Sequence, residues 1–113
     1  MKRIDLPLDR VVDEIGKFYQ FDRHHFIVMN AVDLGDSIEL QWFFSDYAAP
    51  GEVTMFAAKT DASHIIPSIT RVVPSAWVAE AELVDLMGIN IENAKKGFVL
   101  EEDFDGAPLR KKQ

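Results

Sequence analysis

Three strand-like runs, joined by very short connections, constrain the fold of this chain more than any other feature. Residues 24–34 (HHFIVMNAVDL), 38–47 (IELQWFFSDY) and 52–60 (EVTMFAAKT) are rich in β-branched and aromatic residues. The middle run alternates with a period of two, as a half-buried strand does, and its inward positions are Ile38, Leu40, Trp42 and Phe44. The connections GDS and AAPG are too short for the crossover that parallel strands need. The sequence therefore predicts an antiparallel meander.

A helix is predicted on either side of this meander. The first segment, residues 6–21 (LPLDRVVDEIGKFYQF), tolerates Pro7 in its first turn and places its apolar residues at helical spacing: Leu8, Val11, Val12, Ile15, Phe18 and Tyr19. The second segment, residues 74–89 (PSAWVAEAELVDLMGI), has Ser75 as its predicted N-cap. Gly88 is expected to end it in the left-handed conformation.

An antiparallel sheet of three or more strands with two helices packed mainly on one face is an α+β fold, expected here as a single domain over residues 1–113. A further short strand is predicted around 97–100. The other face of the sheet would be open, and we expect Phe43 and Phe56 on it, beside Glu39, Gln41 and Ser45. Several exposed apolar residues together usually mark a partner site. A loop or the C-terminal tail is an equally acceptable cover for them.

The charge of the chain argues against several classes of function. Its net charge of −7 opposes binding to nucleic-acid phosphates and to anionic membrane surfaces. We find no run of 18 apolar residues that would span a bilayer. The first residues, MKRIDLPLDR, lack the apolar segment of a secretory signal, so a cytoplasmic location is expected.

The absence of cysteine limits the redox chemistry of the chain. Without cysteine there is no disulfide, no thiolate nucleophile and no Cys-ligated zinc or iron–sulfur cluster. His24 and His25 would point to opposite faces of a strand, so a shared metal ion is less expected than a structural role. The sequence shows no Gly-rich phosphate loop, no Ser nucleophile elbow and no HExxH motif. Catalysis by this chain alone is therefore not expected.

The second predicted helix is apolar nearly all round, and its only charges are the carboxylates Glu80, Glu82 and Asp85. Such a helix is normally buried on more than one side, so we expect the fold to cover one side and a partner another. Asp85 stands in the last turn, where the helix dipole disfavours an anion by a few tenths to ~1 kcal/mol. A cation from this chain or from a partner would offset that cost, although a solvated Asp tolerates it. An acid–base role for Glu82 and Asp85 has no further support in the sequence.

Three segments of the chain match a family signature in their order and approximate spacing: IIPSIT (65–70), AEAELVDLMGI (79–89) and DFDGAPLRKK (103–112). Together they resemble the 30 kDa subunit of respiratory complex I and its relatives in membrane-bound, energy-converting NiFe hydrogenases. The matching residues are Pro67, Ser68, Ile69, Thr70, Glu80, Glu82, Asp85, Gly88, Ile89, Gly106, Pro108, Leu109, Arg110 and Lys111.

The chain departs from this family pattern at several positions. Ala81 replaces an arginine, Val84 an aromatic residue, Met87 a phenylalanine and Lys112 an aspartate, and Trp77 sits one position early. The usual GHPDLR segment is absent, and ENAKKGF stands in its place. These departures indicate a divergent member of the hydrogenase type rather than a quinone-reducing complex I subunit.

The resemblance implies a non-catalytic subunit that carries no cofactor and docks onto a catalytic large subunit beside a cluster-bearing small subunit. Iron–sulfur and NiFe centres are then expected in those partners, and contact with the inner face of the cell membrane only through the complex. The isolated chain is expected to self-associate or to expose apolar surface. The predicted partner interface comprises Trp77, Glu80, Glu82, Asp85, Met87, Pro108, Leu109, Arg110 and Lys111. The alternative is a free-standing α+β binding module with a pocket between the sheet and the second helix.

Overall fold

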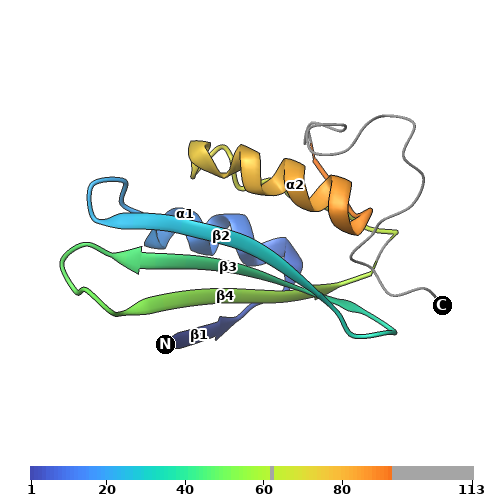
Figure 1. Cartoon of the computed structure of the whole chain (residues 1–113), viewed down its shortest axis with the longest axis horizontal. Helices are drawn as coiled ribbons and strands as arrows, with labels where there is room; N and C mark the ends of the chain where they lie inside the picture. Colours follow the sequence, from blue (N-terminus) through green and yellow to red (C-terminus); the bar gives the residue numbers. More distant parts are fainter. Residues whose placement is uncertain (62, 93–113) are drawn as a thin grey trace.

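A four-stranded sheet with two helices on one side makes up most of the computed structural model, which describes residues 1–61 and 63–92 (Figure 1). The sheet has the order β1-β4-β3-β2, and a parallel pair, β5-β6, forms a second small sheet. The strands are β1 Lys2–Asp5, β2 His24–Asp33, β3 Ile38–Asp46, β4 Val53–Thr60, β5 Ile65–Ile66 and β6 Asn90–Ile91. The helices are α1 Val11–Phe18 and α2 Trp77–Met87, each preceded by a 3-10 turn, Leu8–Arg10 and Pro74–Ala76. The predicted α+β class is confirmed.

The predicted meander is present, because β2, β3 and β4 pair antiparallel in sequence order. The turns that join them contain Gly35 and Gly51, whose φ angles of 94° and 91° lie in the left-handed region that favours glycine. The sequence interpretation missed β1, which pairs parallel with β4. Its four residues, KRID, are mostly charged and exposed, as edge strands often are, and therefore lack the alternation of a half-buried strand.

The core lies between the sheet and the two helices. The inward positions predicted for β3 are confirmed, since Ile38, Leu40, Trp42 and Phe44 are all buried. From α1, Val11, Val12 and Ile15 join them, and from α2, Leu83, Val84 and Met87. Phe18 is half-buried and packs edge-on against Phe44 and Phe56, with ring centroids 5.5 and 5.2 Å apart.

The prediction that Phe56 shares the open face with Phe43 is wrong. In the register of the sheet, Phe56 pairs with Trp42 and so points into the core, whereas Met55 pairs with Phe43. A shift of one residue moves a side chain to the other face, and β4 gave no alternation from which to choose. Met55 to Ala58 are all buried, so β4 shows no alternation of buried and exposed residues there.

The helix ends differ in part from the prediction. The first α-helix is shorter than the helical spacing suggested, because it begins after the 3-10 turn and ends at Phe18. Ser75 is not the N-cap of α2, since it lies inside the 3-10 turn and Ala76 precedes the helix. Gly88 does end α2 in the left-handed conformation, with φ of 66°. The strand predicted around 97–100 lies outside the described residues. Over the described part of the chain, no helix is long and apolar enough to cross a bilayer.

Candidate docking site

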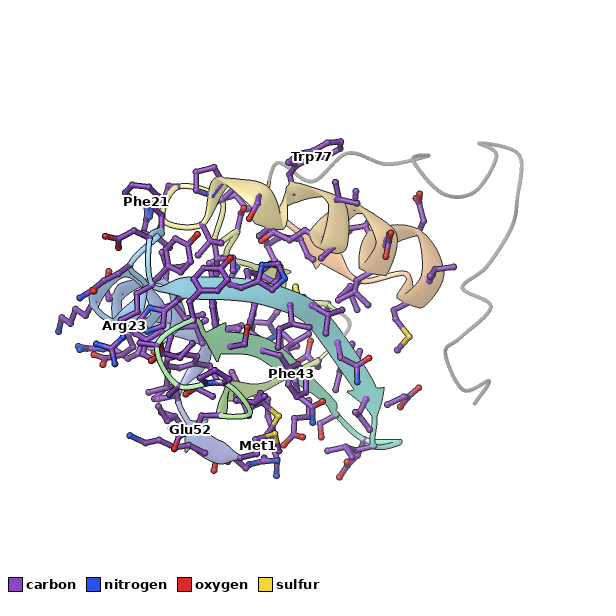
Figure 2. All side chains as sticks on the ribbon, turned by 60° about the vertical axis from the view of Figure 1, so that its left-hand side comes forward. Met1, Phe21, Arg23, Phe43, Glu52 and Trp77 are labelled. Carbon is purple, nitrogen blue, oxygen red and sulfur yellow. The ribbon has the colours of Figure 1, made fainter. Side chains whose placement is uncertain are left out.

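The side chains of α2 divide into an inner and an outer set. Glu80 and Asp85 are buried, with 2% and 9% of their surface exposed, and Met87 is buried among the core residues. Trp77 is 48% exposed and projects from the first turn of the helix, away from the sheet (Figure 2). Glu82 is also exposed. The predicted interface residues Pro108, Leu109, Arg110 and Lys111 lie outside the described residues.

Glu80 ties α2 to the loop that precedes it. Its Oε1 accepts a hydrogen bond of 2.7 Å from the Ser68 hydroxyl, and its Oε2 accepts one of 2.9 Å from the Ile69 N–H. The Ser68 oxygen in turn accepts a 3.1 Å hydrogen bond from the Thr70 N–H. Burial raises the pKa of Glu80, and the donors Ser68 and Ile69 act against that rise. The structure thus brings together residues of two segments, 65–70 and 79–89, that resemble the family signature.

The sequence interpretation missed this contact. Glu80 was expected to face a partner, as a carboxylate on an otherwise apolar helix. Its buried position could have been suspected from Ser68 and Thr70, whose hydroxyl groups supply donors next to a proline-ended loop. Within the chain, Glu80 links α2 to Ser68 and Ile69, and Trp77 and Glu82 of the same helix are exposed.

The described residues do not assemble a metal site. In that part of the chain, His, Asp and Glu side chains nowhere form a group of three that could hold a metal ion. His24 is buried, stacks on Phe18 at 4.2 Å between ring centroids, and accepts a 3.0 Å hydrogen bond from the Gln20 N–H. His25 is exposed, so the two neighbours do point to opposite faces, as predicted. His64 pairs with Asp61 at 2.9 Å.

A cleft of about 840 Å³ lies where the start of α1 meets the β2–β3 turn and the end of β4. It is lined by apolar residues and by charges of both signs, including Asp9, Asp13, Asp36, Lys59 and Arg71. Residues of α2 line none of its walls. The pocket between the sheet and the second helix that a free-standing binding module was expected to have is therefore not this cleft.

Comparison with known proteins places the chain in a family. The sequence model described as "Respiratory-chain NADH dehydrogenase, 30 Kd subunit" matches residues 5–113. This chain belongs to that family. The match spans the Ser68–Glu80 contact and α2, so the features described above lie within the family domain.

A solved structure shares the fold. It is a chain in the "Structure of the membrane-bound sulfane sulfur reductase (MBS), an archaeal respiratory membrane complex". The two chains superpose with a TM-score of 0.74 and 18% sequence identity, over 97% of this chain and 71% of that one. At this identity the likeness establishes the fold. Comparison with curated protein sequences finds no significant match.

Proposed function

We propose that this chain is a non-catalytic docking subunit, a single domain, of a membrane-associated, complex I-like oxidoreductase of the energy-converting hydrogenase type. The observation that carries the proposal is the match to the 30 kDa subunit family over residues 5–113. The fold shared with a chain of an archaeal respiratory membrane complex supports it. The lack of cysteine fits a subunit whose iron–sulfur and NiFe centres belong to its partners.

The outer side of α2 is the surface we propose for docking onto the large catalytic subunit, beside the cluster-bearing small subunit. An exposed tryptophan is the residue type most often found at the energetic centre of interfaces, and Trp77 offers one. Glu82 adds a carboxylate that a cation on the partner would pair with. Glu80 supports this surface from inside the fold through Ser68 and Ile69.

The hydrogenase type is proposed from the departures from the family pattern, two of which fall at buried positions of α2. Ala81 is fully buried and Val84 nearly so, where the resembling family has an arginine and an aromatic residue. Either larger side chain would need the core around α2 to rearrange, because protein interiors are close-packed. The two departures therefore reflect a local repacking of the helix. Association with the membrane, on its inner face, comes through the partner subunits in this proposal.

Isolation of the native complex through a tag on this chain tests the proposal. We expect a large catalytic subunit and a cluster-bearing small subunit to co-purify in equal amounts with it and to be identified by mass spectrometry. A chain that runs alone as a monomer, with neither partner present, would contradict the proposal and favour the free-standing binding module.

A further inference from the structure

The sheet face opposite the helices, which we call the open face, carries an apolar patch. The patch consists of Ile27 and Val28 from β2, Phe43 from β3 and Val53 from β4, and it adjoins Met55 of β4, which is buried. Ile27 and Val28 are 46% and 42% exposed, and Phe43 is half-buried near the middle of the sheet (Figure 2). Val28 is the strand partner of Phe43, so the exposed part of the patch joins β2 to β3, and the buried Met55 lies on the other side of Phe43.

A β-bulge enlarges this patch. Phe26 pairs with Phe44 and Val28 pairs with Phe43, so Ile27 is an extra residue in β2. Phe26 and Met29, on either side of the bulge, both stay in the core. The two residues between them therefore both face outward, and two β-branched side chains lie opposite one phenylalanine. Bulges interrupt the ladder of hydrogen bonds and serve to redirect side chains. Here the redirected side chain is apolar and points to solvent.

Five polar side chains of the open face bond to one another. Arg3 of β1 forms an ion pair with Glu39 of β3 across β4 and another with Asp5 at 2.9 Å. Gln41 donates a 2.8 Å hydrogen bond to Glu39 and accepts one of 3.3 Å from Asn30 of β2. The Arg3 guanidinium lowers the pKa of Glu39, with help from Gln41, so this carboxylate stays ionised and paired.

The charge of the open face sums to zero, unlike that of the chain. Arg3 and Lys59 balance Asp5 and Glu39, whereas the whole chain has a net charge of −7. Polar groups that are already hydrogen-bonded are buried at lower cost than groups that would lose water without replacement. A neutral face with internal polar pairs and an apolar centre therefore matches an apolar, uncharged surface, and it offers little to a strongly charged one.

We infer that the open face is a second docking surface, whose occupant is an apolar, uncharged helix or sheet face of a partner subunit. This inference rests on the proposed function.

The test compares two variants, one with a new charge in the patch and one with a new charge elsewhere on the surface. Val28→Asp puts an uncompensated carboxylate beside Phe43, and Ile65→Asp does the same at an exposed apolar residue of β5. In the native complex recovered through a tagged chain, we expect Val28→Asp to lower partner recovery about tenfold or more, the effect of ~1.4 kcal/mol. Ile65→Asp should leave recovery unchanged. Circular dichroism establishes that both variants fold.

Footprinting of the wild-type chain tests the same surface without a substitution. Carbene labelling of Ile27, Val28 and Phe43 should fall on assembly relative to the isolated chain. A complex that forms while these residues stay labelled, or that tolerates Val28→Asp, would overturn the inference and leave the proposed function intact. If no partner is recovered even with wild type, the proposed function itself fails. A dimer of the isolated chain that Val28→Asp abolishes, with the complex intact, would identify a second copy as the occupant and also overturn the inference.

Discussion

At the scale of single residues, Trp42 tests the orientation of the sheet. It is fully buried on β3, and its indole N–H has no hydrogen-bond acceptor among the described residues. We expect Trp42→Ala to lower the free energy of unfolding by about 3–5 kcal/mol, as for other large buried aromatics. Trp42→Phe is the matched control, since it keeps most of the volume and removes the unpaired donor. We expect it to cost less than half as much. Urea unfolding measures both, and a loss below about 1 kcal/mol for Trp42→Ala would contradict its burial.

Glu80 makes a prediction about pH. Burial raises its pKa in the folded state above the value in the unfolded chain, so the folded state binds this proton at a higher pH. Between those two pKa values the free energy of unfolding falls as pH rises, and above both the fold holds a buried charge. Glu80→Gln removes the titration, while its amide still accepts from the Ile69 N–H and donates to the Ser68 oxygen.

We therefore expect Glu80→Gln to gain stability relative to wild type as pH rises above about 4, where an ordinary glutamate carboxyl ionises. Urea unfolding at several pH values measures the difference. Glu82→Gln is the matched control, because it removes one charge from the exposed side of the same helix. If the free energies of unfolding of Glu80→Gln and wild type differ by the same amount at every pH, the Glu80 carboxyl does not titrate in this range.

At the scale of elements, the sequence predicted the features that local patterns determine. It missed the features that depend on residues far away in the chain. The alternation in β3 predicted its two faces, and Gly88 predicted the end of α2, because both are local effects. The parallel pairing of β1 with β4 joins residues about fifty positions apart, and KRID carries no periodicity of its own. The residues around Phe56, TMFAA, do not alternate between apolar and polar, so the side taken by Phe56 could not be read from its neighbours.

The candidate site shows the same division. The exposure of Trp77 and Glu82 on α2 agrees with an outward-facing side, but the burial of Glu80 depends on donors from Ser68 and Ile69 in a separate segment. A helical projection places a carboxylate on one side of a helix. It does not tell whether that side meets solvent, a partner or a loop of the same chain.

The outer side of α2 gives a prediction of its own. Trp77→Ala should weaken assembly with the large subunit by about 2 kcal/mol or more, the size of an interface hot spot, because an exposed tryptophan adds much contact area on binding. Tyr47→Ala, an exposed aromatic in the turn after β3, is the matched control and should bind as wild type does. Binding is measured by titration of the purified partner. If Trp77→Ala and Tyr47→Ala lose the same binding free energy, the outer side of α2 is not part of the interface.

At the scale of the whole molecule, the composition predicts that the isolated chain carries no redox centre. The chain has no cysteine and three histidines, of which His24 and His64 take part in contacts within the fold. We expect the purified chain to bind neither an iron–sulfur cluster nor nickel, and to show neither hydrogenase nor NADH oxidation activity alone. Anaerobic reconstitution followed by absorbance and metal analysis is the measurement. Cluster absorbance in stoichiometric amount would contradict the assignment of all redox centres to partner subunits.

The last prediction joins α2 to the end of the chain. Asp85 lies in the last turn of α2, where the helix dipole disfavours an anion, and it is 9% exposed. Arg110 carries a planar guanidinium suited to a carboxylate, within the PLRK segment that resembles the family signature. The tail lies outside the described residues, so the pairing of Asp85 with Arg110 is a hypothesis.

We expect Asp85→Asn and Arg110→Ala each to weaken assembly with the partner subunits. If the two residues pair, the second substitution removes little that the first has not already removed, so the double variant should lose less binding free energy than the sum of the single losses. The purified partner is titrated against wild type, the two single variants and the double variant, which gives the double-mutant cycle. Unfolding experiments separate losses of binding from losses of stability. Strictly additive losses would refute the pairing. Assembly at wild-type strength after deletion of residues 106–113 would go further, because it would show that the tail has no part in docking.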